Sequence, residues 1–170
     1  MHNAYCMQLG PIRLIPLSAE DSEKMRVLRN KNRNCFVYSG EISEQAQAAW
    51  YQSYLERTDD YMFSVIYVPT GMWIGAVGLY DIAGGEAEFG RLLVDGTAVG
   101  KRGLGVPVTE AACRIGFESI ELQRIRLEVY ADNMAAVKTY EKAGFSYFGG
   151  CKDKTGRDML CMEIFNSSSK

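Results

Sequence analysis

The stretch Gly100-Lys101-Arg102-Gly103-Leu104-Gly105 decides the fold prediction because of what lies on either side of it. The residues before it, about 85–95, predict a β-strand. The residues after it predict a helix with one apolar face, made of Leu104, Val108, Ala111, Ala112 and Ile115. A glycine-rich turn at a helix start directs backbone N–H groups and the positive end of the helix dipole toward one point. With Lys101 and Arg102 added, the turn predicts a phosphate site, the alternative being an ordinary strand-to-helix turn.

Two familiar phosphate motifs do not match this loop. A Walker A loop has four residues between its first two glycines and ends in Gly-Lys-Ser/Thr, whereas Gly96 and Gly100 are three residues apart and Arg102 follows Lys101. The dinucleotide motif G-x-G-x-x-G has the opposite spacing and opens a Rossmann unit near the start of a domain. A phosphate site at this loop therefore belongs neither to a P-loop fold nor to a Rossmann fold.

Outward from the loop, the sequence alternates predicted strands and helices. Strands are expected near 12–17, 61–68, 72–81, 85–95, 124–130, 145–152 and 157–165. Helices are expected near 18–31, 43–55, 104–115 and 133–142, with Ser18 and Ser43 as N-caps and Gly144 ending the last helix. This order predicts one mixed α/β domain over residues 1–170, with a central sheet of about seven strands, about four helices and a loose tail at 166–170.

Composition narrows the function classes. The chain has 170 residues, 47% of them hydrophobic, which is enough to build one substantial core. Its net charge of -2 disfavours a nucleic-acid binder. Its one histidine, His2, excludes Ser-His-Asp and Cys-His nucleophiles elsewhere in the chain, and with them zinc sites built on histidine pairs.

The cysteines and the apolar stretches indicate a cytoplasmic protein. The five cysteines are scattered without a C-x-x-C pair, so we expect reduced thiols acting mostly as small core residues, and no metal site. Residues 61–80 carry no charge, but Pro69-Thr70-Gly71 interrupts them and predicts a buried β-hairpin instead of a membrane span. The first ten residues lack the pattern of a signal peptide.

Taken together, the loop and the motif that follows it resemble a known family. The sequence resembles the GNAT superfamily of acetyl-CoA-dependent N-acetyltransferases in the order and spacing of two motifs. The first contains Gly103 and Gly105, and the second is Asn133-x6-Tyr140-x3-Gly144-Phe145. The resemblance spans nearly the whole chain and implies the GNAT fold, with a splayed strand pair at the cofactor site. The family signature Gln/Arg-x-x-Gly-x-Gly/Ala has one departure, because Gly100 stands at the Gln/Arg position.

The resemblance implies acetyl-CoA as cosubstrate and assigns residues to it. The pyrophosphate would be held by the loop from Gly100 to Val106, that is Gly100, Lys101, Arg102, Gly103, Leu104, Gly105 and Val106. The splayed strand would pair with pantetheine through Leu93 and Val94, and its free N–H groups would polarise the thioester carbonyl. Asn133 would cap its helix and contact the cofactor.

Catalysis by direct attack of an amine in a ternary complex needs a base and an acid. An alkylammonium has a pKa of about 10, so a base must remove its proton before the nitrogen can attack. Glu88 is the candidate base. The alternatives are Glu86, which lies on the same strand face, and a water molecule. The alternative roles of Glu88 are structural, as a partner of Arg91 or another cation, or limited to positioning the substrate. By resemblance, Tyr140 would protonate the departing thiolate. A packed aromatic is the alternative role for Tyr140.

The acceptor is expected to be a small amine bound by the first two helices, their loop and the last hairpin. The segment 28–43 is basic and aromatic, which suits an anionic or nucleotide-linked acceptor. Together with 76–82 and 86–92 it is similar to enzymes that acetylate amino-sugar nucleotides. Acetyltransferases of ribosomal-protein N-termini, antibiotics or polyamines are the alternatives. Two further alternatives are not enzymes: a module that binds CoA without catalysis, and an α/β binding domain without a CoA site. The chain is expected to act as a monomer or homodimer, away from membranes.

Overall fold

An eight-stranded mixed sheet forms the centre of the computed structural model, which describes residues 2–36 and 39–168. The order across the sheet is β1-β2-β3-β4-β5-β6-β8-β7, and only β5 and β6 run parallel. The strands are β1 (Met7–Leu9), β2 (Ile12–Pro16), β3 (Asp60–Tyr67), β4 (Met72–Ala83), β5 (Glu86–Val94), β6 (Arg124–Tyr130), β7 (Ser146–Lys152) and β8 (Asp158–Phe165).

Four α-helices within the described residues begin where the sequence predicts, to within a residue or two. They are α1 (Ala19–Lys31), α2 (Glu44–Glu56), α3 (Gly105–Arg114) and α4 (Met134–Lys142). The Ser18 hydroxyl accepts from the Asp21 amide at 3.1 Å, and the Ser43 hydroxyl accepts from the Ala46 amide at the same distance. Both predicted caps are confirmed. A π-helical turn, Ile115–Ser119, continues α3.

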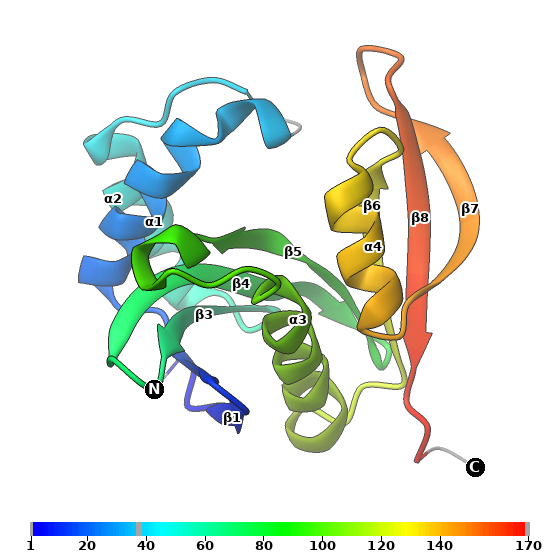
Figure 1. The fold of residues 1–170 in the computed structure, drawn as a ribbon, viewed down its shortest axis with the longest axis horizontal. Helices are drawn as coiled ribbons and strands as arrows, with labels where there is room; N and C mark the ends of the chain where they lie inside the picture. The colour runs from blue at the N-terminus through cyan, green and yellow to red at the C-terminus, as the bar shows by residue number, and fades with distance from the viewer. Residues whose placement is uncertain (1, 37–38, 169–170) are drawn as a thin grey trace.

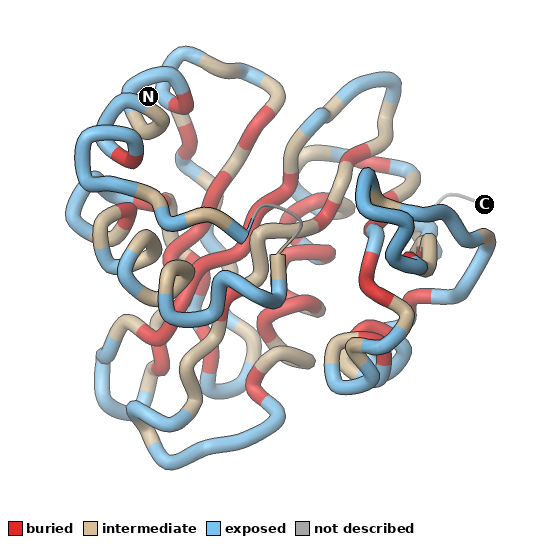
Figure 2. Tube along the Cα trace, turned by 90° about the horizontal axis from the view of Figure 1, so that it is seen from above, coloured by how far each residue is buried: buried red, intermediate tan, exposed pale blue. Residues whose placement is uncertain are grey.

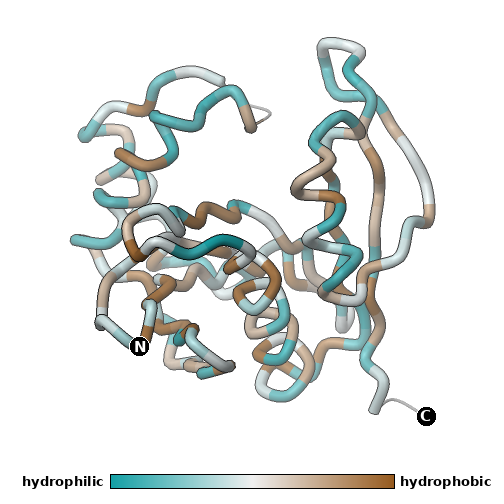
Figure 3. Tube along the Cα trace, in the orientation of Figure 1, coloured by the Kyte–Doolittle hydropathy of each residue, from teal (hydrophilic) through white to brown (hydrophobic). Residues whose placement is uncertain are grey.

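The helices cover the two faces of the sheet in pairs. On one face, Met62 and Ala76 are buried under α1 and α2 together with Tyr54. On the other, the main core joins Phe63 and Val77 to α3 and α4. Figure 1 shows the two pairs lying apart, and Figure 2 shows the buried residues running through the centre between exposed turns. Figure 3 shows the same pattern in hydropathy, with hydrophilic positions along the outside of α1.

The sheet opens between β5 and β6. These strands pair only over 86–88, where Glu86 faces Arg124 and Glu88 faces Arg126, and they diverge beyond that point (Figure 1). At the same place the register between β4 and β5 shifts, and Arg91 takes a positive φ of 53°. The remaining backbone of β5 up to Val94 therefore borders the opening. The splayed strand pair predicted at the cofactor site is confirmed.

Two expectations need correction. The sheet has eight strands, not about seven, because the three-residue β1 is too short to show a periodic pattern. The cysteines are not mostly core residues: Cys113 is buried, but Cys6, Cys35 and Cys151 are exposed and Cys161 is half-buried. Cys151 and Cys161 lie on the β7–β8 hairpin, which ends the sheet, and not in its core.

The uncharged stretch 61–80 forms the antiparallel strands β3 and β4, as predicted. No helix in the described part of the chain has the length and apolar character needed to cross a membrane.

Candidate active site

The opening between β5 and β6 leads into a cavity of about 740 Å³. Its walls come from α1, the segment that follows α1, α2, β4, β5, β6, α4 and β8. From the predicted acceptor segment, Arg29, Cys35, Phe36, Glu41 and Ile42 line the cavity, and Met159 does so from the last hairpin. Val37 and Tyr38 of that segment lie outside the described residues. The cavity thus forms where the sequence places the acceptor.

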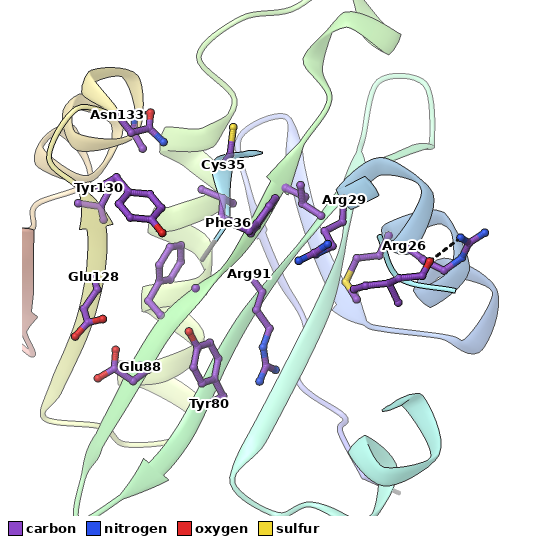
Figure 4. Close-up of a pocket in the computed structure, with 18 of the residues that line it drawn as sticks. Arg26, Arg29, Cys35, Phe36, Tyr80, Glu88, Arg91, Glu128, Tyr130 and Asn133 are labelled. Atoms are coloured by element: carbon purple, nitrogen blue, oxygen red, sulfur yellow. Dashed lines mark hydrogen bonds between the residues drawn. The ribbon is translucent and has the colours of Figure 1, made fainter. Parts of the chain in front are cut away.

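Charges of opposite sign occupy different sides of this cavity. Figure 4 shows the carboxylates of Glu88 and Glu128 close together on β5 and β6, while Arg26, Arg29 and Arg91 lie on the side of α1. Aromatic side chains from Phe36, Trp50, Tyr80 and Tyr130 line the walls between and around them. Glu41 adds a negative charge near the arginines. The cavity is therefore bipolar, not uniformly basic.

Glu88 is half-buried in the cavity wall beside one arginine. Its carboxylate lies 3.3 Å from the Arg126 guanidinium. Burial raises the pKa of Glu88 above its usual range, Arg126 acts in the opposite direction, and the neighbouring Glu128 raises it further. Arg91, the cation named from the sequence as a possible partner of Glu88, pairs elsewhere, donating to both oxygens of the buried Asp60 at 2.8 and 2.9 Å.

Glu86 shares the strand face of Glu88 but not its place in the cavity. Its carboxylate lies 3.5 Å from Arg124 and 3.6 Å from Arg126, in a cluster of ion pairs at the start of β5. Glu88 lines the cavity, and Glu86 is not among the lining residues. The geometry therefore favours Glu88 over Glu86 as the group that meets an acceptor.

Tyr140 reaches the same cavity from α4. Its ring packs against Phe89 at 5.6 Å and Phe145 at 6.1 Å between centroids, so its orientation is fixed by the core. Burial raises the pKa of Tyr140 to about 12, with a smaller contribution from Tyr80. Its phenol is therefore protonated at neutral pH and is available as a proton donor. The ring of Tyr140 is therefore packed in the core while the residue also lines the cavity.

A second cavity of about 360 Å³ lies along the glycine loop. Predicted cofactor residues that line it are Val94, Lys101, Arg102, Gly103, Leu104 and Gly105. Gly103 has a φ of +74°, a left-handed conformation that glycine adopts without strain. Leu104, at the N-cap of α3, makes no side-chain capping hydrogen bond, and Pro107 in the first turn has no N–H. The cavity thus opens at a helix start whose amides suit phosphate oxygens.

The remaining predicted cofactor residues are distributed differently. Leu93 and Asn133 line the larger cavity. The Asn133 side chain also accepts from the Ala136 amide at 3.3 Å, which confirms its capping role. Gly100 and Val106 line neither of the two cavities. Leu92 and Ala136 line both, so the cavities adjoin at the split, beside Leu93.

Several lining residues were not named individually from the sequence, although the first three lie in segments expected to bind the acceptor or to resemble its enzymes: Arg26, Trp50, Tyr80, Glu128 and Tyr130. Glu128 had a usable signal, because alternation along β6 places it on the face of Arg124 and Arg126, and Arg126 faces Glu88. The others come from elements far apart in the chain. Nothing in their local sequence distinguishes them from packed or surface residues.

Comparison with known proteins identifies the family. Residues 12–146 match the family model for an acetyltransferase (GNAT) domain. The chain belongs to the GNAT acetyltransferase family. A probable N-acetyltransferase from Bacillus subtilis (strain 168), YjcK, is 26% identical over 141 residues, covering 76% of this chain and 77% of the relative.

Solved GNAT structures agree with this. The spermidine N-acetyltransferase from Vibrio cholerae, in complex with CoA and spermine, superposes with a TM-score of 0.81 at 25% identity, covering 94% of this chain and 98% of that one. Apo FdhC, a nucleotide-linked sugar GNAT, has the same fold at a TM-score of 0.83 and 18% identity, covering 97% and 92%. The chain is an N-acetyltransferase with the GNAT fold, and its cosubstrate is acetyl-CoA.

Proposed function

We propose that this GNAT enzyme acetylates a small primary amine that carries an anionic group, with an amino sugar linked to a nucleotide as the favoured acceptor. The observation that carries the proposal is the bipolar cavity. An ammonium group suits the side of Glu88 and Glu128, and a phosphate suits the side of Arg26 and Arg29. The aromatic walls suit the flat face of a sugar or a base.

The larger cavity would bind the acceptor and the smaller one the pantetheine and pyrophosphate of acetyl-CoA. Acetyl-CoA supplies the activated acetyl group. The backbone of β5 at Leu93 and Val94 borders the opening, where its N–H groups would support the thioester carbonyl as it gains negative charge. Lys101 and Arg102 add charge at the pyrophosphate end of the cavity.

Proton transfers are assigned to two residues of the larger cavity. The Glu88 carboxylate would take the proton of the acceptor ammonium, directly or through a water. Its raised pKa makes it a stronger base than an exposed glutamate, and Arg126 keeps a useful fraction ionised. Tyr140 would donate its phenolic proton to the departing thiolate. Both roles need only side chains that already line the cavity.

A polyamine acceptor is the second candidate. It is favoured by the likeness to the spermidine N-acetyltransferase from Vibrio cholerae at 25% identity and by the three carboxylates, Glu41, Glu88 and Glu128, in the cavity wall. Two of the three arginines in that wall are already paired, Arg91 with Asp60 and Arg26 with Glu23, so they oppose a polycation less than unpaired arginines would. We rank the anionic amine first because the cavity wall carries charges of both signs.

An amine panel separates these acceptors. The rate of CoA thiol release would be measured with a nucleotide-linked amino sugar, the same amino sugar without its nucleotide, spermidine, a ribosomal-protein N-terminal peptide and an aminoglycoside. We expect the highest kcat/KM for the nucleotide-linked sugar. The variant Arg29→Gln should lower that kcat/KM about tenfold while leaving the free amino sugar unaffected, as expected when a charge-assisted hydrogen bond is lost. A higher kcat/KM for spermidine would overturn the assignment, and no release with any amine would support a non-catalytic module.

A further inference from the structure

A group of metal-ligating side chains lies apart from the two residues assigned to proton transfer, on the last three strands across the sheet, β6, β8 and β7. Glu128 on β6 is directly opposite Cys161 on β8, and Cys151 lies on the neighbouring β7, two positions along from the residue that faces Cys161. Because side chains alternate along a strand, these three positions share one face. Neither cysteine has a role in the acetyl-transfer chemistry proposed above, and Glu128 contributes only its charge to the wall of the acceptor cavity.

The three donor atoms lie within reach of a single ion. The sulfurs of Cys151 and Cys161 are 3.8 Å apart, and the Cys151 sulfur is 3.9 Å from Glu128 Oε1. All three donor atoms lie within 4.8 Å of one another. Two thiolates bound to one tetrahedral zinc ion at 2.3 Å are themselves about 3.8 Å apart. The spacing of the sulfurs thus already matches that of zinc ligands.

The donor set selects the type of ion. Two sulfurs and one carboxylate oxygen favour Zn²⁺ over Mg²⁺ or Ca²⁺, which prefer oxygen ligands. Cys151 and Glu128 are exposed and Cys161 is half-buried, so an ion can enter from solvent. Glu128 also lines the acceptor cavity, so an ion held by these three side chains would lie beside that cavity.

We propose that Glu128, Cys151 and Cys161 form a binding site for one thiophilic divalent cation, Zn²⁺, at the wall of the acceptor cavity. On binding, each thiol gives up its proton to solvent and the sulfur binds the metal as a thiolate. No oxidant or reductant is involved. The sequence predicts no metal site. It carries no local signal for this one, because the two cysteines are ten positions apart and meet only through the pairing of β7 with β8.

Cobalt spectroscopy tests this site without acceptor or acetyl-CoA. Reduced, tag-free protein freed of metal would be titrated with Co²⁺, and then with Zn²⁺ in competition with a chromogenic chelator. We expect one Co²⁺ per chain, with thiolate-to-cobalt charge transfer and the visible absorption of a tetrahedral ion. Zn²⁺ should displace the Co²⁺, and Mg²⁺ should not.

Variants locate the site. Cys151→Ser and Cys161→Ser should each weaken Zn²⁺ binding by about a hundredfold or more, and Glu128→Gln by about tenfold or more, since even indirect partners of a metal ligand matter on this scale. The matched control is Cys6→Ser, which removes an exposed cysteine far from the cluster in the sequence and should bind as the wild type does. Absence of thiolate charge transfer, or its loss in Cys6→Ser but not in Cys151→Ser, would overturn the proposal. Circular dichroism of each variant shows whether the hairpin still folds.

Discussion

The two cavities that meet at the split sheet are built in different ways. The smaller one takes its lining from the single stretch 92–105 together with Ala136 and Thr139. The larger one collects side chains from α1, α2, β4, β5, β6, α4 and β8. The cofactor cavity is therefore a local feature of the chain, whereas the acceptor cavity exists only once the sheet and the helix pairs have assembled. Substitutions in one cavity, away from the boundary that the two share at Leu92 and Ala136 and away from Leu93 and Asn133, should leave ligand binding in the other cavity unchanged.

The largest effect is expected from Tyr140→Phe, which removes a proton donor at the cavity wall while keeping the ring. Since the ring still packs against Phe89 and Phe145, the fold should hold. We expect kcat to fall by about tenfold to a hundredfold, the lower part of the range for acid–base groups, with little change in the KM for acetyl-CoA. Steady-state kinetics with both substrates varied measures this. An unchanged kcat would remove Tyr140 from the acid role.

A smaller effect is expected from Glu88→Gln, and it should depend on pH. The carboxylate is active when deprotonated, so the rate falls as pH drops through its raised pKa. In the wild type, acceptor kcat/KM should rise as the pH increases through the raised pKa of Glu88, at a pH below that at which the amine itself loses its proton. Glu88→Gln should flatten that rise and lower kcat/KM about tenfold near neutral pH.

Glu86→Gln is the matched control for that profile. It removes a carboxylate two residues away on the same strand face that also contacts Arg126. We expect it to keep the wild-type rise. A flat profile in Glu86→Gln with a normal one in Glu88→Gln would assign the base to Glu86, and normal profiles in both would indicate a water.

The smallest effect is expected from Lys101→Ala in the smaller cavity. Its ammonium adds one charge next to a loop whose backbone amides do most of the proposed binding. The KM for acetyl-CoA should rise about threefold at low salt and less at high salt, because exposed charges are screened. The acceptor KM should stay constant. A change confined to the acceptor KM would contradict the separation of the two cavities.

Local signals were enough to predict most of the fold. The caps at Ser18 and Ser43, the apolar face of α3 and the break at Pro69-Thr70-Gly71 each depend on neighbours within a few residues. The strand β1 escaped detection because three residues carry no period. The splayed strand pair came from the family resemblance, and the order of strands across the sheet was not predicted, since pairing across the sheet leaves no local pattern.

The candidate site was predictable only in part, for the same reason. The glycine loop could be located because its residues are consecutive. Trp50, Tyr80 and Arg26 reach the larger cavity from distant elements, and Arg91 pairs with Asp60, a partner that only the folded sheet brings near. Glu88 was predicted as a residue of the active site, but the sequence did not reveal that the carboxylate of Glu128 lies close to it.

Thermal shift with acetyl-CoA tests the separation of the two cavities most directly, because it requires no knowledge of the acceptor. Wild-type protein should gain about 2.7 kcal/mol of stability at a hundredfold excess of ligand over its dissociation constant. Desulfo-CoA should give a similar gain and ATP none. Gly103→Val, which forces a side chain into a left-handed backbone position, should lose the gain, and Arg29→Gln should keep it. A gain that persists in Gly103→Val or disappears in Arg29→Gln would contradict the account.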